Sequence, residues 1–308
     1  MQEKVSVIIT TYGGKQCVER AVKSCLTQTY KNIEIIVVDD SGVGTASQQI
    51  TETILRPYID SKQIIYIPHE RNMNASTARN TGVKHSSGQY ISLLDDDDEY
   101  KSEKIEKQVA AFKNIPADYG IVYCSMHDIV DGTTYEYRAT SKGKVLYKFL
   151  MMQVSACTSN IMIKKSVYEK VNGFDVKFKR HQDWEFLARV AAISNFYGIP
   201  YVGTVKHTQN IVRRYSASQA ESFRLPYIKL LQSLIVDLPR SQQRNILAHE
   251  YNELAKLFMR EKNISKALYY IKLSGKPGQF MKAAIYKPFK VMKEKAMLHR
   301  CDTIILLR

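Results

Sequence analysis

The 308-residue sequence has no apolar run near the ~20 residues that a membrane-spanning helix requires. Its five cysteines, at positions 17, 25, 124, 157 and 301, are scattered, odd in number and without a Cys-x-x-Cys pair. This pattern argues against a disulfide framework or a zinc site and indicates reduced thiols. The first residues enter an apolar strand pattern at once, so we expect no signal peptide and a cytoplasmic protein.

The sequence is rich in positive charge, and that charge is uneven. The net charge is +15, and the stretch from Ala220 to the end has 17 lysines and arginines against 7 aspartates and glutamates. Such asymmetry suggests a surface that meets an anionic partner, such as a membrane, a nucleic acid or an acidic polysaccharide. Nucleic-acid binding would need basic residues clustered with stacking aromatics. The tyrosines are spread along the chain instead, so we expect no nucleic-acid partner.

Apolar, β-branched runs alternate with helical patterns over the first hundred residues. The patterns predict strands at Val5–Thr11, Ile33–Val38, Ile64–Ile67 and Tyr90–Leu94, with helices at Lys15–Gln28, Thr45–Leu55 (closed by Pro57) and Ala75–His85. This alternation predicts βαβ units in an α/β fold with a mostly parallel, Rossmann-like sheet. Ligands of such sheets bind beyond the carboxyl ends of the strands, and Tyr12, Asp39–Asp40 and Asp95–Asp98 all fall there.

The most distinctive stretch is Asp95–Asp98, four consecutive carboxylates directly after a buried strand. One interpretation is a solvated acidic turn before the next helix. The other is a site for Mg²⁺ or Mn²⁺, since these ions prefer hard oxygen ligands and would relieve the repulsion among the acids. The strand-end position favours the metal site.

In the second half of the chain, the sequence patterns predict a mixture of helices and strands, followed by helices only. A helix capped by Ser102 is expected at Ser102–Ile115, followed by strands at Ile121–Met126 and Thr134–Arg138 around an Asp131-Gly132 turn, a strand at Asn160–Lys164 and a helix opening at Gln182. Beyond Ala220 the pattern is helical only, with Asn263 as an expected cap.

The stretch Phe280–His299 places apolar residues among lysines, with Pro288 interrupting them. Two interpretations fit this pattern equally well. One is a basic helix pair on an anionic membrane surface, and the other is solvated helices packed on the body of the protein. The C-terminal helices also offer a surface for a homodimer.

Five motifs in order resemble the family 2 glycosyltransferases, inverting enzymes of the GT-A fold that use nucleotide sugars. They are Val5–Tyr12, Gln28–Ser41, Arg71–Asn72 with Ala78–Gly82, Gly88–Asp98, and Gly173–Asp175 with Gln182–Trp184. Each motif is weak alone, whereas the series is specific. The resemblance implies a GT-A catalytic domain at residues 1–219, with a nucleotide-binding half (1–100) and an acceptor and catalytic-base half (101–219). The basic helical region 220–308 lies outside it.

On the donor side, the resemblance implies that Thr10 and Tyr12 line the nucleotide pocket. Asp40 would accept a hydrogen bond from uracil N3–H, which favours UDP donors. Arg79 would lie near the donor phosphates, although a salt bridge on a helix face is an alternative role for it.

The same resemblance makes Asp97 the direct ligand of a Mn²⁺ or Mg²⁺ ion that bridges the two phosphates. Asp95 would be a second ligand or, like Asp96, would reach the ribose or the waters on the metal. Many relatives have Arg-x-His near the end of the catalytic part. This chain has Arg213-Arg214 and no such histidine, so either arginine would supply positive charge to the leaving group.

Asp183 is the general base that the resemblance implies, because inversion needs one carboxylate to take the proton from the acceptor hydroxyl. The family usually has Glu-Asp here, whereas this chain has Gln182-Asp183. Helix capping is the alternative role for Asp183.

The favoured hypothesis is an inverting, metal-dependent glycosyltransferase. It would move a hexose or N-acetylhexosamine from a UDP-sugar to a glycan or lipid-linked acceptor in bacterial surface-polysaccharide synthesis, at the inner face of the plasma membrane. A nucleotidyltransferase is a second hypothesis, but the sequence has no glycine-rich phosphate loop after the first strand. A non-catalytic protein that binds anionic glycans or nucleic acid is a third, and the acids at 40, 95, 97 and 183 argue against it.

Overall fold

The computed structural model describes residues 3–208, 215–276 and 304–307. They belong to two compact units: Met1–Val145, Val154–Asn210 and Cys301–Arg308 form unit 1, and Leu146–Gln153 with Ile211–Arg300 form unit 2. The domain boundary expected near residue 220 stays a prediction.

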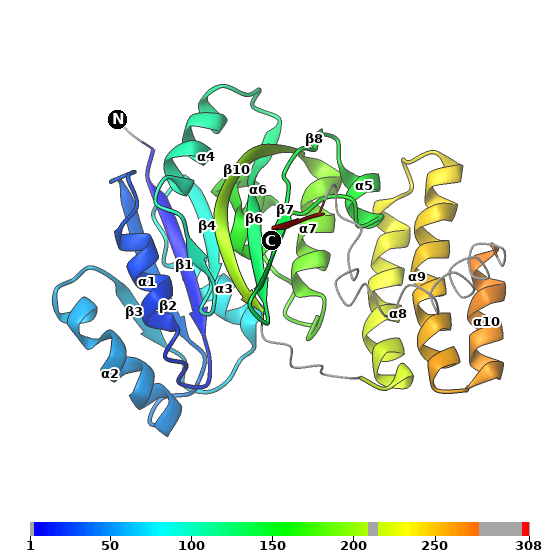
Figure 1. The fold of residues 1–308 in the computed structure, drawn as a ribbon, viewed down its shortest axis with the longest axis horizontal. Helices are drawn as coiled ribbons and strands as arrows, with labels where there is room; N and C mark the ends of the chain where they lie inside the picture. Colours follow the sequence, from blue (N-terminus) through cyan, green and yellow to red (C-terminus); the bar gives the residue numbers. More distant parts are fainter. Residues whose placement is uncertain (1–2, 209–214, 277–303, 308) are drawn as a thin grey trace. The chain divides into compact units, whose positions relative to one another are not determined.

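The N-terminal part of unit 1 is the expected βαβ arrangement. Figure 1 shows β1 between its neighbours, in the order β4-β1-β2-β3, and all three pairings are parallel. The elements are β1 (Val5–Thr11), α1 (Val18–Leu26), β2 (Ile33–Asp39), α2 (Ala46–Asp60), β3 (Ile65–Pro68), α3 (Ala75–Lys84) and β4 (Tyr90–Asp95). The central strands β1 and β2 form because their β-branched side chains are buried on both faces of the sheet.

The remainder of unit 1 extends the sheet with antiparallel pairs. Strand β9 runs antiparallel between β4 and β6, and the long β10 pairs in parallel with β6 and antiparallel with β5 and β8. The elements are β5 (Glu99–Tyr100), α4 (Lys104–Lys113), β6 (Tyr119–Val130), β7 (Thr133–Tyr137), β8 (Lys142–Gly143), a 3₁₀ turn (Thr158–Asn160), β9 (Ile161–Lys164), α6 (Lys165–Lys170), α7 (Gln182–Ile193) and β10 (Asn195–Thr208). The sheet is therefore parallel among β4, β1, β2 and β3, as predicted, and mixed beyond them.

The sheet is covered on both faces. Helices α1, α2 and α4 pack on the face that carries Val7 and Ile9. Helix α3 packs on the opposite face, where a Cβ at Gly82 would lie 2.2 Å from Ile8 Cγ2. The close approach of α3 to β1 therefore requires glycine at this position.

Helix α1 spans Val18–Leu26, inside the predicted Lys15–Gln28, and two further helices also differ from the sequence prediction. Helix α2 continues through Pro57 to Asp60 instead of ending before the proline. Helix α4 begins at Lys104, and Ser102 does not cap it. The Ser102 carbonyl instead accepts a hydrogen bond from the Thr29 N–H at 2.9 Å, so a tertiary contact fixes Ser102 outside the helix.

Unit 2 is helical in its described residues from 217 to 274. It contains α5 (Leu146–Leu150), α8 (Ala217–Leu234), α9 (Arg240–Arg260) and α10 (Ile264–Ser274), and the last three share one apolar core. Asn263 caps α10 as predicted, accepting from the Lys266 N–H at 3.1 Å. The predicted basic helices at Phe280–His299 lie outside the described residues.

The end of the chain differs from the all-helical expectation. Ile304–Leu307 forms strand β11, which pairs antiparallel with β7 in unit 1. Its sequence, Ile-Ile-Leu-Leu, contains β-branched residues, which favour a strand.

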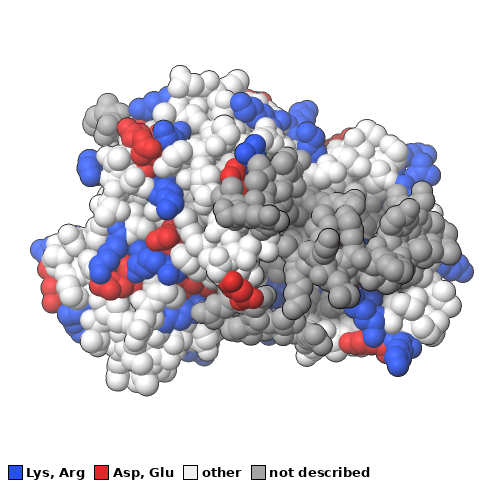
Figure 2. Space-filling model, in the orientation of Figure 1, with Lys and Arg blue, Asp and Glu red and all other residues white. Residues whose placement is uncertain are grey.

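The described helices include none that is both long and apolar enough to cross a bilayer. On the face drawn in Figure 2, lysines and arginines of the described residues are interspersed with aspartates and glutamates. The charge of this face is therefore mixed.

Candidate active site

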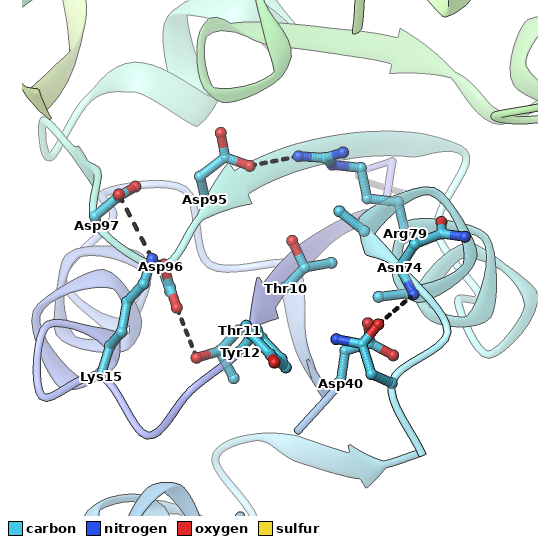
Figure 3. A pocket seen from close by; sticks show the side chains of 13 residues that line it. Thr10, Thr11, Tyr12, Lys15, Asp40, Asn74, Arg79, Asp95, Asp96 and Asp97 are labelled. Atoms are coloured by element: carbon cyan, nitrogen blue, oxygen red, sulfur yellow. Dashed lines mark hydrogen bonds and ion pairs between the residues drawn. The ribbon is translucent and has the colours of Figure 1, made fainter. Parts of the chain in front are cut away.

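A pocket of about 310 Å³ lies beyond the carboxyl ends of β1, β2 and β4. It is lined by Thr10, Thr11, Tyr12, Lys15, Asp40, Asn72, Asn74, Ala75, Ala78, Arg79, Asp95, Asp96 and Asp97, whose side chains are drawn in Figure 3. The structure thus brings together every donor-side residue that the sequence predicted within its described part. Arg213 and Arg214 lie outside the described residues.

One end of this pocket is formed by Tyr12 and Asp40. Tyr12 is 57% exposed and lines the pocket, so its ring is accessible to a ligand. Asp40 is buried, and its Oδ1 accepts from the Met73 N–H at 2.8 Å and lies 2.7 Å from His69 Nδ1. The neighbouring Asp39 instead bonds inside the protein, to Tyr66 and to the Ser41 N–H, and so holds the turn.

His69 fixes the orientation of Asp40. A carboxylate only accepts hydrogen bonds, so Nδ1 carries the proton in this pair. The other ring nitrogen, Nε2, lies 3.0 Å from Thr81 Oγ1. His69 follows β3 directly, and the sequence patterns gave it no role.

Three of the four consecutive aspartates each lie against one cation. The pairs are Asp95 with Arg79 (2.7 Å), Asp96 with Lys15 (2.7 Å) and Asp98 with Lys206 (3.1 Å). Asp97 differs, because its closest ion-pair contact among the described residues is Lys15 at 3.6 Å and its side chain is 48% exposed. Asp97 is therefore the carboxylate that is most available to a ligand.

Burial and the neighbouring cations together move the pKa values of two of these carboxyls in opposite directions. Burial would raise the pKa of Asp95, but the positive charges of Arg79 and Lys206 outweigh it and lower that pKa to about 2. Burial raises the pKa of Asp96, and the nearby Lys15 only partly offsets this. Asp95 thus stays a carboxylate through the physiological pH range.

Asp98 is the most enclosed of the four, with 2% of its side chain exposed. Burial raises its pKa to about 6, opposed by the ammonium of Lys206. Lys206 comes from β10, whose pairing of Val205 with Glu99 places it beside Asp98. Asp98 therefore connects the end of β4 to β10 through its ion pair with Lys206, and it does not line the pocket.

The carboxylate oxygens available in this pocket suit a single divalent cation that prefers oxygen ligands. Mg²⁺ is usually bound by one or two carboxylates together with substrate phosphates. Asp97 provides the available carboxylate, while both oxygens of Asp95 already bond to Arg79 and Thr158. The described residues contain no group of three or more histidine, cysteine or acidic side chains arranged to hold a metal. A ligand phosphate would have to complete the coordination.

A second pocket, of about 220 Å³, adjoins the first. It is lined by Arg79, Asp95, Thr158, Lys179, Arg180, His181, Gln182 and Asp183, so Arg79 and Asp95 line both pockets. His181 stacks on the Trp184 ring at 4.8 Å between centroids. His207, by contrast, pairs with Glu99 at 3.3 Å and lines neither pocket.

Asp183 stands in the first turn of α7, facing the second pocket. His181 occupies the N-cap position, and burial raises the pKa of Asp183 while Arg79 opposes the rise. A carboxyl whose pKa is raised by burial is suited to accept a proton near neutral pH. Helix α7 is anchored by Arg189, which donates to the carbonyls of Val171 and Gly173 and to Glu185.

Residues 6–171 of the chain, more than half of its length, match Glycosyl transferase family 2. The chain belongs to this family. Among curated family 2 relatives, an uncharacterized glycosyltransferase of Rickettsia prowazekii is 33% identical over 202 residues, which are 63% of this chain and 60% of that protein. This chain thus spans less than two thirds of that relative. WfaP of Escherichia coli, named a UDP-Glc:alpha-D-GlcNAc-diphosphoundecaprenol beta-1,3-glucosyltransferase, is 42% identical over 107 residues, 35% of this chain and 40% of WfaP.

Solved structures show the same fold. Residues 1–349 of S. aureus TarS, solved with UDP-GlcNAc, match with a TM-score of 0.61 and 14% identity, covering 90% of this chain and 92% of that one. The mannosyltransferase PcManGT of Pyrobaculum calidifontis, solved with GDP-Man and Mn²⁺, matches with a TM-score of 0.58 and 16% identity over 95% of this chain and 83% of that one. The predicted GT-A fold is confirmed.

Proposed function

We propose that this protein is an inverting, metal-dependent glycosyltransferase. It moves a hexose or N-acetylhexosamine from a UDP-sugar to a glycan or lipid-linked acceptor in surface-polysaccharide synthesis. One observation carries the proposal: the pocket of Asp40 and Asp97 and the pocket of Asp183 meet at the Arg79–Asp95 ion pair. A donor in the first pocket and an acceptor in the second would meet at that pair.

The donor assignment rests on the two ends of the first pocket. Tyr12 and Asp40 suit a base with a ring face and an N–H donor, which uracil provides. Arg79 and Lys15 provide positive charge for a diphosphate, and arginine and lysine are the usual phosphate partners. Two comparisons support a UDP-linked donor: TarS was solved in complex with UDP-GlcNAc, and the name of WfaP includes UDP-Glc.

The chemical step is one displacement. Asp183 takes the proton of the acceptor hydroxyl while that oxygen bonds to the anomeric carbon, and the bond from this carbon to the diphosphate oxygen breaks. The electron pair leaves with UDP, and the anomeric configuration inverts. When bound through Asp97, a divalent cation supplies charge neutralisation to the departing diphosphate. Arg79 supplies a further positive charge from the wall shared by the two pockets.

Membrane contact is the second part of the proposal. The acceptor in the name of WfaP is carried on diphosphoundecaprenol, a lipid, and an acceptor of that class would place this chain at the inner face of the plasma membrane. Helix α10 of unit 2 exposes Ile264, Leu268, Tyr269 and Leu273. Exposed apolar residues near lysines are typical of interfacial helices. Sedimentation with anionic vesicles should recover the protein, and Leu268→Glu should reduce the bound fraction. Equal recovery with neutral vesicles would contradict the charge contribution.

The transfer reaction is tested with four donors, UDP-glucose, UDP-galactose and their N-acetylated forms, in Mn²⁺ with a synthetic GlcNAc-diphospholipid acceptor. We expect release of UDP and a β-linked product from at least one α-linked donor, measured by chromatography and by NMR of the product. Asp183→Asn should lower the rate by about 10³-fold and leave UDP affinity unchanged. A normal rate in Asp183→Asn would remove Asp183 as the base. Absence of UDP binding by the folded protein would refute the UDP donor.

A further inference from the structure

Lys15 is a pocket cation that no family motif in the sequence includes. Its Nζ lies 2.7 Å from Asp96 Oδ1 and 3.6 Å from Asp97 Oδ2. Its side chain is 46% exposed, so the ammonium remains accessible from the pocket. Figure 3 shows Lys15 and Arg79 on opposite sides of the pocket, with Asp97 close to Lys15. The pocket therefore has a cation at each side.

The position of Lys15 is fixed by the protein. Gly13 and Gly14, with φ of +88° and +68°, shape the turn that leads from β1 to Lys15. Asp96 is buried, and its second oxygen, Oδ2, accepts from Thr11 Oγ1 at 2.7 Å. The Thr11 hydroxyl thus orients the carboxylate that holds the lysine. One oxygen of this buried carboxylate therefore remains for Lys15 and holds its ammonium at the pocket.

The ammonium of Lys15 places a positive charge beside the carboxylate that is most available to a metal, with its Nζ 3.6 Å from Asp97 Oδ2. That charge lies across the pocket from Asp40, so it is placed for phosphate and not for a base.

We propose that Lys15 is a second, protein-supplied cation for the diphosphate of the nucleotide, positioned by Asp96 and Thr11. The proposal rests on the proposed function and adds to it that part of the diphosphate affinity is independent of metal. Asp96 is then a positioning residue for Lys15 and makes no contact with the ribose or with the waters on the metal.

Calorimetric titration of the full-length protein with UDP and with uridine, each in EDTA and in Mn²⁺, tests this role. Uridine lacks the phosphates, so the two ligands separate diphosphate contacts from base contacts. We expect Lys15→Met to weaken UDP binding in EDTA by about tenfold, the usual loss for one charged hydrogen bond, and to leave uridine affinity within about twofold. Lys15→Arg, which keeps the charge, should stay within about threefold of the wild type for UDP.

Two further variants guard against structural effects. Lys15→Met combined with Asp96→Asn avoids a buried, unpaired carboxylate and should show the same loss of UDP affinity as Lys15→Met. The matched control is Lys23→Met, which breaks an exposed lysine–glutamate pair on α1 and should change neither affinity.

The outcomes separate the two proposals. Equal UDP affinity of the wild type, Lys15→Met and the double variant in EDTA would overturn the role of Lys15 and leave the proposed function intact. A loss of uridine affinity as large as the loss of UDP affinity in the double variant would likewise overturn the role of Lys15 and leave the proposed function intact. A folded wild type that binds neither ligand in either buffer would overturn both proposals.

Discussion

Arg79 Nη2 lies 2.7 Å from Asp95 Oδ1, and this ion pair lines both pockets of the site. Arg79 also contacts Gln182 Oε1 at 3.4 Å and lies over the Phe174 ring, 5.2 Å from its centroid. One side chain from α3 thereby touches the acidic strand end, the loop at Phe174 and the first turn of the helix that carries Asp183. The Arg79–Asp95 pair thus connects the pocket that contains Asp97 to the pocket that contains Asp183.

Replacing Arg79 tests this connection. Arg79→Met should weaken UDP binding and lower the transfer rate by about 10²-fold or more, because it removes a phosphate cation and leaves Asp95 without its main partner. Arg79→Lys should recover only part of the loss, since an ammonium cannot reproduce the planar guanidinium contacts. Arg56→Met, which breaks an exposed pair with Glu52 on α2, is the matched control. A rate for Arg79→Met within threefold of the wild type would contradict the assignment.

The pH dependence of transfer tests the base. Burial raises the pKa of Asp183, so the carboxylate that accepts a proton is lost as the pH falls through this raised value. We therefore expect kcat/KM to decrease on the acidic side, with a midpoint above the ordinary 3.8 of an aspartate. Measuring kcat/KM from pH 4.5 to pH 8 at saturating Mn²⁺ tests this decrease. Gln182→Glu should move the midpoint upward because it adds a second negative charge beside Asp183. A profile that is flat in both proteins would contradict the prediction.

His69 is expected to affect only the binding of the nucleobase. His69→Phe removes both ring-nitrogen contacts, to Asp40 and to Thr81, and so frees the Asp40 carboxylate to rotate. Uridine and UDP affinity should then fall together by about tenfold, the loss of one charged hydrogen bond. Lys15→Met should weaken UDP and spare uridine. His85→Phe, at the exposed end of α3, is the control. Unchanged uridine affinity in His69→Phe would show that Asp40 needs no support from His69.

The Asp98–Lys206 pair predicts a pH-dependent change in stability. Lys206→Met leaves a buried carboxylate unpaired and should lower the free energy of unfolding by about 3 kcal/mol at pH 7.5. The folded pKa of Asp98 is already raised to about 6, above its ordinary 3.8, and it rises further without the lysine. A raised carboxyl pKa favours the folded state at low pH and stops doing so as the pH climbs through it. The loss should therefore be smaller at pH 5, measured by urea unfolding at both pH values. An equal loss at both would contradict the pairing.

The sequence predicted the parts of the site that depend on local pattern. Strands buried on both faces could be located from their apolar runs, and the rule that ligands bind at strand ends then placed Tyr12, Asp40 and Asp97 in one pocket. Asp183 and Arg79 needed the motif series as well, since each has an ordinary structural role when considered alone. The roles of these residues in catalysis and metal binding remain predictions.

The partners of these residues could not be predicted, because they come from distant parts of the chain. Lys15 lies 81 residues from Asp96 and Lys206 lies 108 residues from Asp98. Their contacts depend on the register of β10 and on a turn with two glycines. The Gly-Gly-Lys sequence directly after a strand end was a usable signal for Lys15. Ser102 was misassigned for the same reason, since its carbonyl accepts a hydrogen bond from the distant Thr29 N–H and the helix begins two residues later.

The measurement that tests the central claim most directly is the affinity for UDP with and without Mn²⁺ in the wild type and in Asp97→Ala. Asp60→Ala, an exposed aspartate at the end of α2, serves as the control. The account predicts that Mn²⁺ tightens UDP binding by about tenfold or more in the wild type and in the control. Asp97→Ala should bind UDP with the same affinity in both buffers. Equal tightening by Mn²⁺ in Asp97→Ala, or no UDP binding by the folded wild type, would contradict the account.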